Sequence, residues 1–538
     1  MLALLVLNSA LSFSTWWPTP GIVLEARLAP EFVGLWLVLL VLVWRRGVPS
    51  PPWLTGLTLA YMVLVLGRYA DVTTPSLFGR EINLYWDGLQ IPRFLWVSSQ
   101  ERPWWQTAAV VAGAGLIIGL LFKMIRSAMT VAVQWAAPEA LRRRWALVVT
   151  ALASALAVMN LAGVEATWPY LSKPVIPTYA KQFRVIGHAL SEQSQGNLLP
   201  ASTSVSEAMN QPREALVSLQ GRDVYLMPME SVGAITYDNP QAHATLGPVR
   251  AQFARDVAAN GQHVVSAFFR SPTFGGGTDL AHLGLLTGIN LSNPMAHDVL
   301  LTTSRPTLMS LFKAAGYTTF GVYPGVFWEW PERAFYNYDV FIDGPHLGYQ
   351  GPELGYWKIP DQYSVARFEQ MHPRQSGTPP RFVFFPTITC HLPFSPVPPF
   401  QPDWQKILTP QPFEAQETAA LLQERPNWLN MFPDYVRMVA YTYRVLGSHL
   451  RQPQAREAIY LLVGDHQPAA NVTGAGASWD VPVHIVSRDV NLLKRFKALG
   501  FEDGMNPNRQ PLAALHELTG MMLKVFGPSL AQPSGTRI

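Results

Sequence analysis

Several short stretches of this chain hold residues that commonly bind metals or act as nucleophiles. The most distinctive is Ser271–Gly288, in which three consecutive glycines lead into Thr278 and an apolar, helix-compatible segment. Glycines allow backbone N–H groups to crowd around an anion, and the positive end of a helix dipole adds to the attraction. A threonine hydroxyl there can be a nucleophile and a metal ligand if carboxylates and a cation converge on it. The alternative is an ordinary glycine turn, with Thr278 or Asp279 as the helix N-cap.

Two further stretches place ionisable groups directly after apolar runs. Glu230 follows Arg222–Met229, and Asp465 and His466 leave the run Ile459–Val463 through a glycine. Carboxylate oxygens beside an imidazole suit one divalent cation, and Mn, Mg and Zn all remain open. For Glu230 alone, a solvated loop acid is the simpler interpretation. For Asp465 and His466 a metal site is favoured, because burying two ionisable side chains at the end of an apolar strand is unfavourable unless a partner such as a metal ion compensates.

The stretch Thr387–Phe394 contains His391 beside the only cysteine of the chain, Cys390. His391 can bind a metal, contact a phosphate oxygen or protonate a leaving group. The alternative for His391 is a structural loop histidine. Cys390 has no partner for an intrachain disulfide, and its setting favours a small buried hydrophobe over a reactive thiol.

The runs that carry these residues alternate with helical segments from about residue 221. Strands are predicted at Arg222–Met229, His263–Phe269, Tyr317–Tyr323, Arg381–Phe385, Ile459–Val463 and Val481–Val486. Helices are predicted at Ala251–Asn260, Thr307–Ala315, Tyr435–Leu450 and Pro511–Phe526. This alternation predicts an α/β sandwich with a largely parallel sheet over residues 221–526, and a site at the carboxyl ends of its strands. Residues 527–538 are expected to form a loose tail.

Charged residues make up only 14% and hydrophobic residues 49% of the chain, which suggests membrane embedding. The shortage of charged residues is concentrated in the first third of the chain. Its apolar segments are Leu2–Trp16, Glu31–Trp44, Trp53–Leu66, Thr107–Phe122 and Trp145–Leu161. Several are shorter than the roughly 20 residues that span a bilayer, so their edges must extend into flanking residues. Tryptophans near the segment ends match an interfacial belt. We therefore predict five transmembrane helices in residues 1–165, followed by a juxtamembrane helix and linker in residues 166–220.

Charged residues indicate the orientation of these helices and the class of partner. Arg45 and Arg46 follow the second segment, Lys123 and Arg126 follow the fourth, and three arginines precede the fifth. All lie on one side if the segments alternate, so that side is cytoplasmic and everything after about residue 165 lies outside. The first segment lacks a positively charged start, which favours an uncleaved anchor over a signal peptide. The net charge of +4 is small, and no basic stripe suggests a nucleic-acid partner.

Taken in order, these motifs resemble the alkaline phosphatase/sulfatase superfamily. A glutamate after the first strand, a threonine that opens a helix, His-x-Pro-Phe and Gly-Asp-His-x-Pro occur in the superfamily's order. The resemblance is to the membrane branch of lipoteichoic acid synthases and phosphoethanolamine transferases. Those proteins also have five transmembrane helices before an external catalytic domain, so the resemblance covers nearly the whole chain.

The resemblance implies the roles of particular residues. One divalent cation would be held by Glu230, Thr278, Asp465 and His466. Thr278 would also be the nucleophile, and His391 would contact the phosphate or the leaving group. The stretch from Phe327 to Arg333 resembles the synthase segment whose tryptophan and arginine bind a glycerophosphate head group. Trp328 and Arg333 are therefore candidates for substrate binding, although the spacing differs by about one residue and an Asn-Arg pair is replaced by Glu-Trp; the alternative is an exposed aromatic loop.

The reaction that the resemblance implies moves a phosphoglycerol or phosphoethanolamine-type group from a membrane phospholipid to an envelope glycan or glycolipid, through a phospho-threonine. The protein would be multi-pass in the bacterial inner (plasma) membrane, with its catalytic domain on the periplasmic or extracellular side. The alternatives are a phosphodiesterase or hydrolase of the same fold, with water as acceptor, and a catalytically silent membrane sensor. A true sulfatase is disfavoured because Cys390 lacks the Cys/Ser-x-Pro-x-Arg context and Thr278 cannot become formylglycine. Asp279 and His282 are left as supporting or structural residues.

Overall fold

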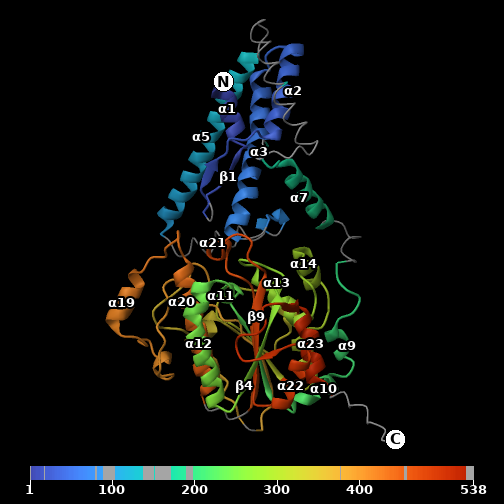
Figure 1. The fold of residues 1–538 in the computed structure, drawn as a ribbon, viewed down its shortest axis with the longest axis vertical. Coiled ribbons are helices and arrows are strands. Elements are labelled where there is room, and N and C mark those ends of the chain that lie inside the picture. The colour runs from blue at the N-terminus through green and yellow to red at the C-terminus, as the bar shows by residue number, and fades with distance from the viewer. Residues whose placement is uncertain are drawn as a thin grey trace. The chain divides into compact units, whose positions relative to one another are not determined.

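The protein is described from a computed structural model (Figure 1). The described residues are 2–16, 19–78, 81–85, 87–88, 103–136, 151, 171–189, 198–375, 377–452 and 457–528. The chain divides into two compact units, residues 1–192 and 193–538. The boundary falls inside the segment 166–220 that is predicted to link the membrane part to the catalytic part, and the predicted domain ranges themselves stay predictions.

The first unit is helical apart from a small hairpin. Its elements are α1 (Leu2–Ser9), β1 (Phe13–Thr15), β2 (Ile22–Leu24), α2 (Pro30–Arg46), α3 (Pro51–Phe78), α5 (Trp104–Ala136) and α7 (Ile176–Ala189). Helix α2 starts with Pro30 in its first turn and ends at Gly47, whose φ of 79° closes the helix. Helices α1, α2 and α3 all pack against α5 through buried apolar side chains.

Among the described residues, two helices are long and apolar enough to cross a membrane, Pro51–Leu77 and Trp104–Ala136. The predicted first segment is helical only over the eight residues of α1 and then becomes β1, so this helix is shorter than the roughly 20 residues a span needs. The predicted fifth segment, Trp145–Leu161, lies outside the described residues except for residue 151. The bundle of five transmembrane helices and its orientation therefore remain predictions.

The second unit is built on a nine-stranded mixed sheet. Its strands are β3 (Asp223–Met229), β4 (His263–Arg270), β5 (Thr318–Tyr323), β6 (Val340–Asp343), β7 (Arg381–Phe384), β8 (Ala458–Gly464), β9 (Asp480–Ser487), β10 (Glu502–Asp503) and β11 (Pro511–Ala514). The order is β10-β4-β9-β8-β3-β7-β5-β6, with β11 paired to β4. The run from β8 to β6 is parallel, and β9 is antiparallel to both of its neighbours. Strands β3, β8 and β9 are buried along their whole length, as expected when helices cover both faces.

Helices cover the sheet on both sides. Helices α12 (Pro240–Ala259), α18 (Asp361–Met371) and α20 (Phe432–Arg451) contribute to one large apolar core with the strands. Helices α22 (Val490–Ala498) and α23 (Glu517–Phe526) lie on the other side of the sheet from α12 and α20 (Figure 1). Shorter helices complete the unit: α9 (Ser204–Ala208), α10 (Pro212–Ala215), α11 (Ile235–Asp238), α13 (Thr278–Thr287), α14 (Pro294–Leu301), α15 (Leu308–Ala314), α16 (Arg333–Tyr336), α17 (Gly344–Leu347), α19 (Ala415–Gln423) and α21 (Ala470–Thr473). The predicted α/β sandwich is confirmed for this unit.

Two element predictions are wrong in their bounds. The segment Pro511–Phe526 is not one helix, because its first residues form β11 beside β4 and the helix starts at Glu517. Pairing with the sheet overrides the helix preference of the Leu-Ala-Ala run there. Helix α12 begins at Pro240 rather than at residue 251 and contains Pro248, a residue that usually ends a helix.

Candidate active site

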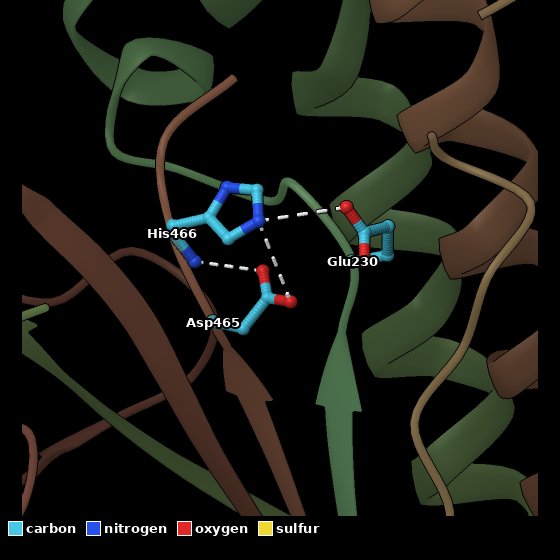
Figure 2. A group of neighbouring side chains, drawn as sticks. All are labelled: Glu230, Asp465 and His466. Carbon is cyan, nitrogen blue, oxygen red and sulfur yellow. Dashed lines mark hydrogen bonds and ion pairs between the residues drawn. The ribbon is translucent and has the colours of Figure 1, made fainter. Parts of the chain in front are cut away.

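The register of two neighbouring strands brings the first group of predicted residues together. Met229 at the end of β3 lies opposite Gly464 at the end of β8, in a parallel pair. The residues that follow, Glu230 and Asp465, therefore leave the sheet at the same edge. One ligand atom from each of Glu230, Asp465 and His466 lies within 4.8 Å of the others, and all three residues are buried. Figure 2 shows the three side chains converging from these two strand ends.

The imidazole of His466 presents its Nε2 atom to the two carboxylates. Its Nδ1 lies 2.8 Å from the carbonyl oxygen of Gln467, so the N–H of the neutral ring is placed on Nδ1. The Nε2 lone pair then lies 3.5 Å from Oε1 of Glu230 and 3.9 Å from Oδ2 of Asp465 (Figure 2). A ring held through Nδ1 by a carbonyl, with Nε2 directed at carboxylates, is the usual arrangement of a metal-binding histidine.

The two carboxylates are fixed by neighbouring groups on one oxygen each. Asp465 Oδ1 accepts hydrogen bonds from the backbone N–H of Ser231, at 2.9 Å, and of His466, at 2.7 Å. Glu230 Oε1 accepts from the Ser231 hydroxyl at 2.9 Å. Asp465 Oδ2 is buried without a hydrogen bond, and the nearest imidazole atom outside the group is His282 Nε2, at 3.7 Å. A buried carboxylate oxygen that lacks a donor and faces an open imidazole nitrogen fits a cation.

The charges of this group oppose one another in the absence of a cation. Burial, followed by the neighbouring Asp465 carboxylate, raises the pKa of Glu230 well above its ordinary value. Burial alone would also raise the pKa of Asp465, but the nearby His466 and His282 outweigh it and lower that pKa. The two buried carboxylates therefore repel each other when both are charged, and a bound divalent cation would remove this repulsion.

Thr278 completes the group from the glycine turn. Its Oγ1 lies 3.2 Å from His466 Nε2. Gly277, not Thr278 or Asp279, is the N-cap of α13, and no side chain caps this helix. The simple capping interpretation is thus wrong, and the Thr278 hydroxyl instead lies beside Glu230, Asp465 and His466, the candidate metal-binding group. Its position in the first turn of α13 also places it at the positive end of the helix dipole.

The backbone before Thr278 requires glycine. Gly277 has a φ of 74°, and a Cβ atom there would lie 2.8 Å from Thr273 Oγ1. We expect Gly277→Ala to shift Thr278 and lower kcat by about 100-fold, the effect of a displacement on the order of 1 Å at a reacting group. Gly316→Ala is the matched control, because Gly316 has a φ of 96° with nothing within 4 Å of its Cβ position. Its kcat should stay unchanged while both variants lose about 1 kcal/mol of stability; equal kcat values for the two would contradict the assignment.

His391 follows β7, the strand on the other side of β3. Its half-buried ring stacks on Tyr356, with centroids 4.4 Å apart and planes at 17°, and meets the ring of Trp357 at 5.4 Å. Its Nδ1 lies 2.7 Å from the carbonyl oxygen of Leu392, which leaves Nε2 as an acceptor in the neutral ring. Burial lowers the pKa of His391 to about 4, so the ring is neutral at pH 7.

The sequence prediction missed the residues that hold the His391 loop. Asp361 is buried, and its Oδ1 accepts from the backbone N–H of Ile388, at 2.8 Å, and of Thr389, at 3.2 Å. In return the Thr389 hydroxyl accepts from the backbone N–H of Asp361 at 2.8 Å. The hydroxyl of Thr387 accepts from the backbone N–H of Glu230 at 3.0 Å and so joins the loop to the metal-binding group. In the sequence, the alternating threonines Thr387 and Thr389 after β7 were the signal for these hydrogen bonds.

Trp328 and Arg333 do not belong to the metal-binding group. Both line a separate hollow of about 310 Å³, together with Phe327, Glu329, Trp330, Pro331, Asp343 and Pro345. The ring of Trp328 lies 6.1 Å from that of Trp357, which in turn contacts His391. The guanidinium of Arg333 lies over the ring of Phe341, 5.0 Å from its centroid. Substrate binding by Trp328 and Arg333 stays a prediction.

Comparison with known proteins identifies the class of this unit. The family model for sulfatases matches residues 255–485, which include Thr278, His391, Asp465 and His466. Residues 255–485 are therefore similar in sequence to sulfatases, as the order of the motifs predicts. Glu230 lies before the matched residues and is placed in the site by the pairing of β3 with β8. No curated protein matches the chain.

Three solved structures are similar to this chain at low identity. An alkaline phosphatase superfamily protein from Vibrio parahaemolyticus is 15% identical, over 58% of this chain and 70% of that one, with a TM-score of 0.36. The lipoteichoic acid synthase LtaP from Listeria monocytogenes is 12% identical, over 57% and 71%, with a TM-score of 0.34. The Streptococcus pyogenes phosphoglycerol transferase GacH, in complex with sn-glycerol-1-phosphate, is 13% identical, over 64% and 82%, with a TM-score of 0.36.

Proposed function

We propose that this protein is a metal-dependent phosphotransferase of the sulfatase fold. It moves a phosphoglycerol or phosphoethanolamine-type group from a membrane phospholipid to an envelope glycan or glycolipid. The observation that carries the proposal is the placement of the Thr278 hydroxyl 3.2 Å from His466 Nε2, beside two buried carboxylates and at the start of α13. A hydroxyl in that setting suits nucleophilic attack on phosphorus, and threonine cannot supply the formylglycine of a true sulfatase.

The residues present fit one divalent cation. Glu230, Thr278, Asp465 and His466 would hold it, with three oxygen donors and one nitrogen donor that suit Mn, Mg or Zn. When bound, a divalent cation lowers the pKa of the threonine hydroxyl and neutralises charge on a phosphodiester. The hydrogen bonds of Ser231 and of the Gln467 carbonyl keep the carboxylates and the imidazole in place for this role.

The reaction proceeds in two displacements at phosphorus. Thr278 Oγ1 loses its proton and forms a bond to phosphorus as the bond from phosphorus to the lipid oxygen breaks. The lipid leaves as a hydroxyl, so the proton that Thr278 gives up balances the one that the lipid gains. The phospho-threonine then lies at the N-terminus of α13, where the helix dipole stabilises its charge. The bond between phosphorus and Thr278 Oγ1 breaks next and Oγ1 regains a proton, as an acceptor hydroxyl attacks phosphorus and loses its own proton. Neutral His391 can take that proton at Nε2, and a bound anionic phosphodiester would favour its protonated form for the first step.

The proposed role of His391 predicts a defined effect on rate and on pH dependence. His391→Gln should lower kcat by about 10²- to 10⁴-fold, the usual contribution of a general acid or base. Because the pKa of His391 is lowered to about 4, the ring is uncharged above that pH in the free enzyme. The kcat/KM of the wild-type enzyme should therefore show no step from His391 between pH 5 and 8, and it should fall below about pH 4. A step near pH 6.5 that His391→Gln abolishes would contradict this assignment.

The membrane part supports a lipid donor. Two described helices are long and apolar enough to cross a bilayer, and attachment in the same chain keeps the site near phospholipids at high effective concentration. We place the protein as a multi-pass protein of the bacterial inner membrane with an external catalytic domain, on the distribution of basic residues. Release of a labelled diacylglycerol from a fluorescent phospholipid, with and without an envelope glycan fraction, tests the proposal. Release that is independent of any acceptor other than water would favour the hydrolase alternative, and no release with any phospholipid would favour a silent sensor.

A further inference from the structure

The catalytic unit carries a small group of exposed apolar side chains at one place on its surface. Leu422, Trp428 and Leu429 are 50%, 59% and 79% exposed, and they lie within eight residues of one another. We call these three residues the apolar rim. Helix α19, which contains Leu422, has no fully buried residue. Large apolar side chains gathered in this way mark a surface that is covered by something else.

The apolar rim is held in a defined conformation. The side-chain oxygen of Asn427 accepts from the backbone N–H groups of Leu429 and Asn430, each at 3.2 Å. The backbone N–H of Asn430 also donates to the Asn427 carbonyl at 3.0 Å. On α19, Leu421 packs against the core, so the next residue, Leu422, faces outward. The exposure of the rim is therefore a product of the local fold.

The apolar rim lies beside the catalytic loops. Glu424, between Leu422 and Trp428, accepts a hydrogen bond from the Ser395 hydroxyl at 3.3 Å, and Ser395 lies four residues after His391. The rim leads directly into α20, whose first turn contains Tyr435. The Tyr435 hydroxyl donates to the Ser231 carbonyl at 2.9 Å, next to Glu230. The chain on either side of the rim thus contacts the loops that carry Glu230 and His391, through Glu424 and Tyr435.

We propose that the apolar rim docks on the phospholipid bilayer in which the same chain is anchored. Tryptophan and leucine partition to the boundary between head groups and acyl chains, and the exposed Arg425 nearby can meet lipid phosphates. Three side chains are far fewer than the roughly 20–30 residues per side of a stable protein interface, but they suffice for weak, reversible membrane contact by a tethered domain. Docking through the rim would bring lipid head groups close to Thr278 and His391. This proposal rests on the membrane placement within the proposed function and not on the chemistry.

Site-specific fluorescence tests the docking directly. The single natural cysteine, Cys390, is fully buried, so a cysteine introduced at Leu429 can be labelled selectively in the full-length protein. The protein is reconstituted in vesicles of phosphatidylethanolamine and phosphatidylglycerol, with and without brominated acyl chains. Val490→Cys is the control, because Val490 is 46% exposed and follows Asp489, which pairs with Arg222 at the start of β3, the opposite end of the sheet.

The label at 429 should shift to the blue on reconstitution and be quenched by brominated lipid, as expected for a group about 5–10 Å into the interface. The label at 490 should do neither. Equal quenching at both positions, or an unchanged label at 429, would overturn the proposal. The quenching does not depend on turnover, so a protein that is inactive on every donor would sink the proposed function and leave this result standing.

A kinetic comparison supplies the second readout. The double variant Trp428→Asp, Leu429→Asp should raise KM for a long-chain phospholipid in vesicles by about tenfold, the effect of losing burial of one large apolar side chain. Turnover of a short-chain phospholipid below its micelle concentration should stay unchanged, which also shows that the site is folded. An unchanged KM in vesicles, or an equal loss on both substrates, would overturn docking by the rim.

Discussion

Thr278→Ala is expected to lower kcat by about 10⁴-fold or more, because removal of a nucleophile leaves only binding and electrostatic effects. The Thr278 hydroxyl lies at the N-terminus of α13 and 3.2 Å from His466 Nε2. The loss should appear in kcat with little change in KM, since binding of the phosphodiester depends on other groups. The measurement is turnover of a fluorescent phospholipid by purified protein in vesicles.

Two controls separate loss of the nucleophile from damage to the fold. Thr278→Ser keeps a hydroxyl and should retain measurable turnover, whereas Thr302→Ala removes an exposed threonine at the end of α14 and should leave kcat unchanged. The unfolding temperatures of all three variants should lie within a few degrees of wild type, because Thr278 has no capping role in α13. Full turnover by Thr278→Ala would mean that another group attacks phosphorus.

Glu230→Gln is expected to abolish activity and yet stabilise the metal-free protein. The two carboxylates of Glu230 and Asp465 are buried together, and the Ser231 hydroxyl donates to Glu230 Oε1, a bond that glutamine Oε1 can also accept. Removing one buried like charge should raise the free energy of unfolding in chelator by about 1–3 kcal/mol. Wild type should instead gain about 2.7 kcal/mol when a cation is present at 100 times its Kd, and the variant should gain almost nothing.

The same variant changes how stability depends on pH in chelator. The pKa of Glu230 is raised in the folded protein, so between its ordinary value of 4.5 and the raised value the folded state binds more protons than the unfolded state. Wild-type stability therefore falls as pH rises through that window. The lowered pKa of Asp465 acts below its ordinary value of 3.8, outside the window, and the difference between wild type and Glu230→Gln isolates Glu230. Thermal melts in chelator at several pH values provide the measurement.

Glu353→Gln is the control for the loss of one negative charge, because Glu353 pairs with Lys358 at 3.3 Å on the exposed surface. This control should bind cation and unfold like wild type, since a surface ion pair contributes at most about 1 kcal/mol. If Glu230→Gln lowers stability in chelator or keeps full cation binding, Glu230 is a structural residue and the proposed metal site is wrong.

The convergence of Glu230, Asp465 and His466, with Thr278 beside them, could be predicted from the sequence because each member directly follows a buried strand or opens a helix. Apolar runs fixed the positions of β3 and β8, and their parallel pairing placed Glu230 beside Asp465. The glycines before Thr278 identified the start of α13 even though the capping role suggested for Thr278 was wrong. Local signals were sufficient here because ionisable residues at the carboxyl ends of adjacent parallel strands meet whatever the rest of the fold does.

The supporting residues could not be predicted, because their partners are distant in sequence. Asp361 meets the Thr389 region from the start of α18, and Tyr356 stacks on His391 from an irregular loop. No periodic pattern encodes such contacts, which depend on tertiary packing. The same reason explains β11, which forms because β4 offers an open edge, and the helix preference of its residues gave no sign of that edge.

The central claim is that Thr278 carries the phosphoryl group between donor and acceptor. It is tested most directly by acid-quenching the full-length protein during turnover of a phospholipid donor and mapping the modified peptide by mass spectrometry. We expect a phosphoester on Thr278, with the added mass of a glycerophosphate or phosphoethanolamine group, that is absent from Thr278→Ala and disappears when acceptor is added. A fully active enzyme with no adduct at Thr278, or with the adduct on another residue, would contradict it.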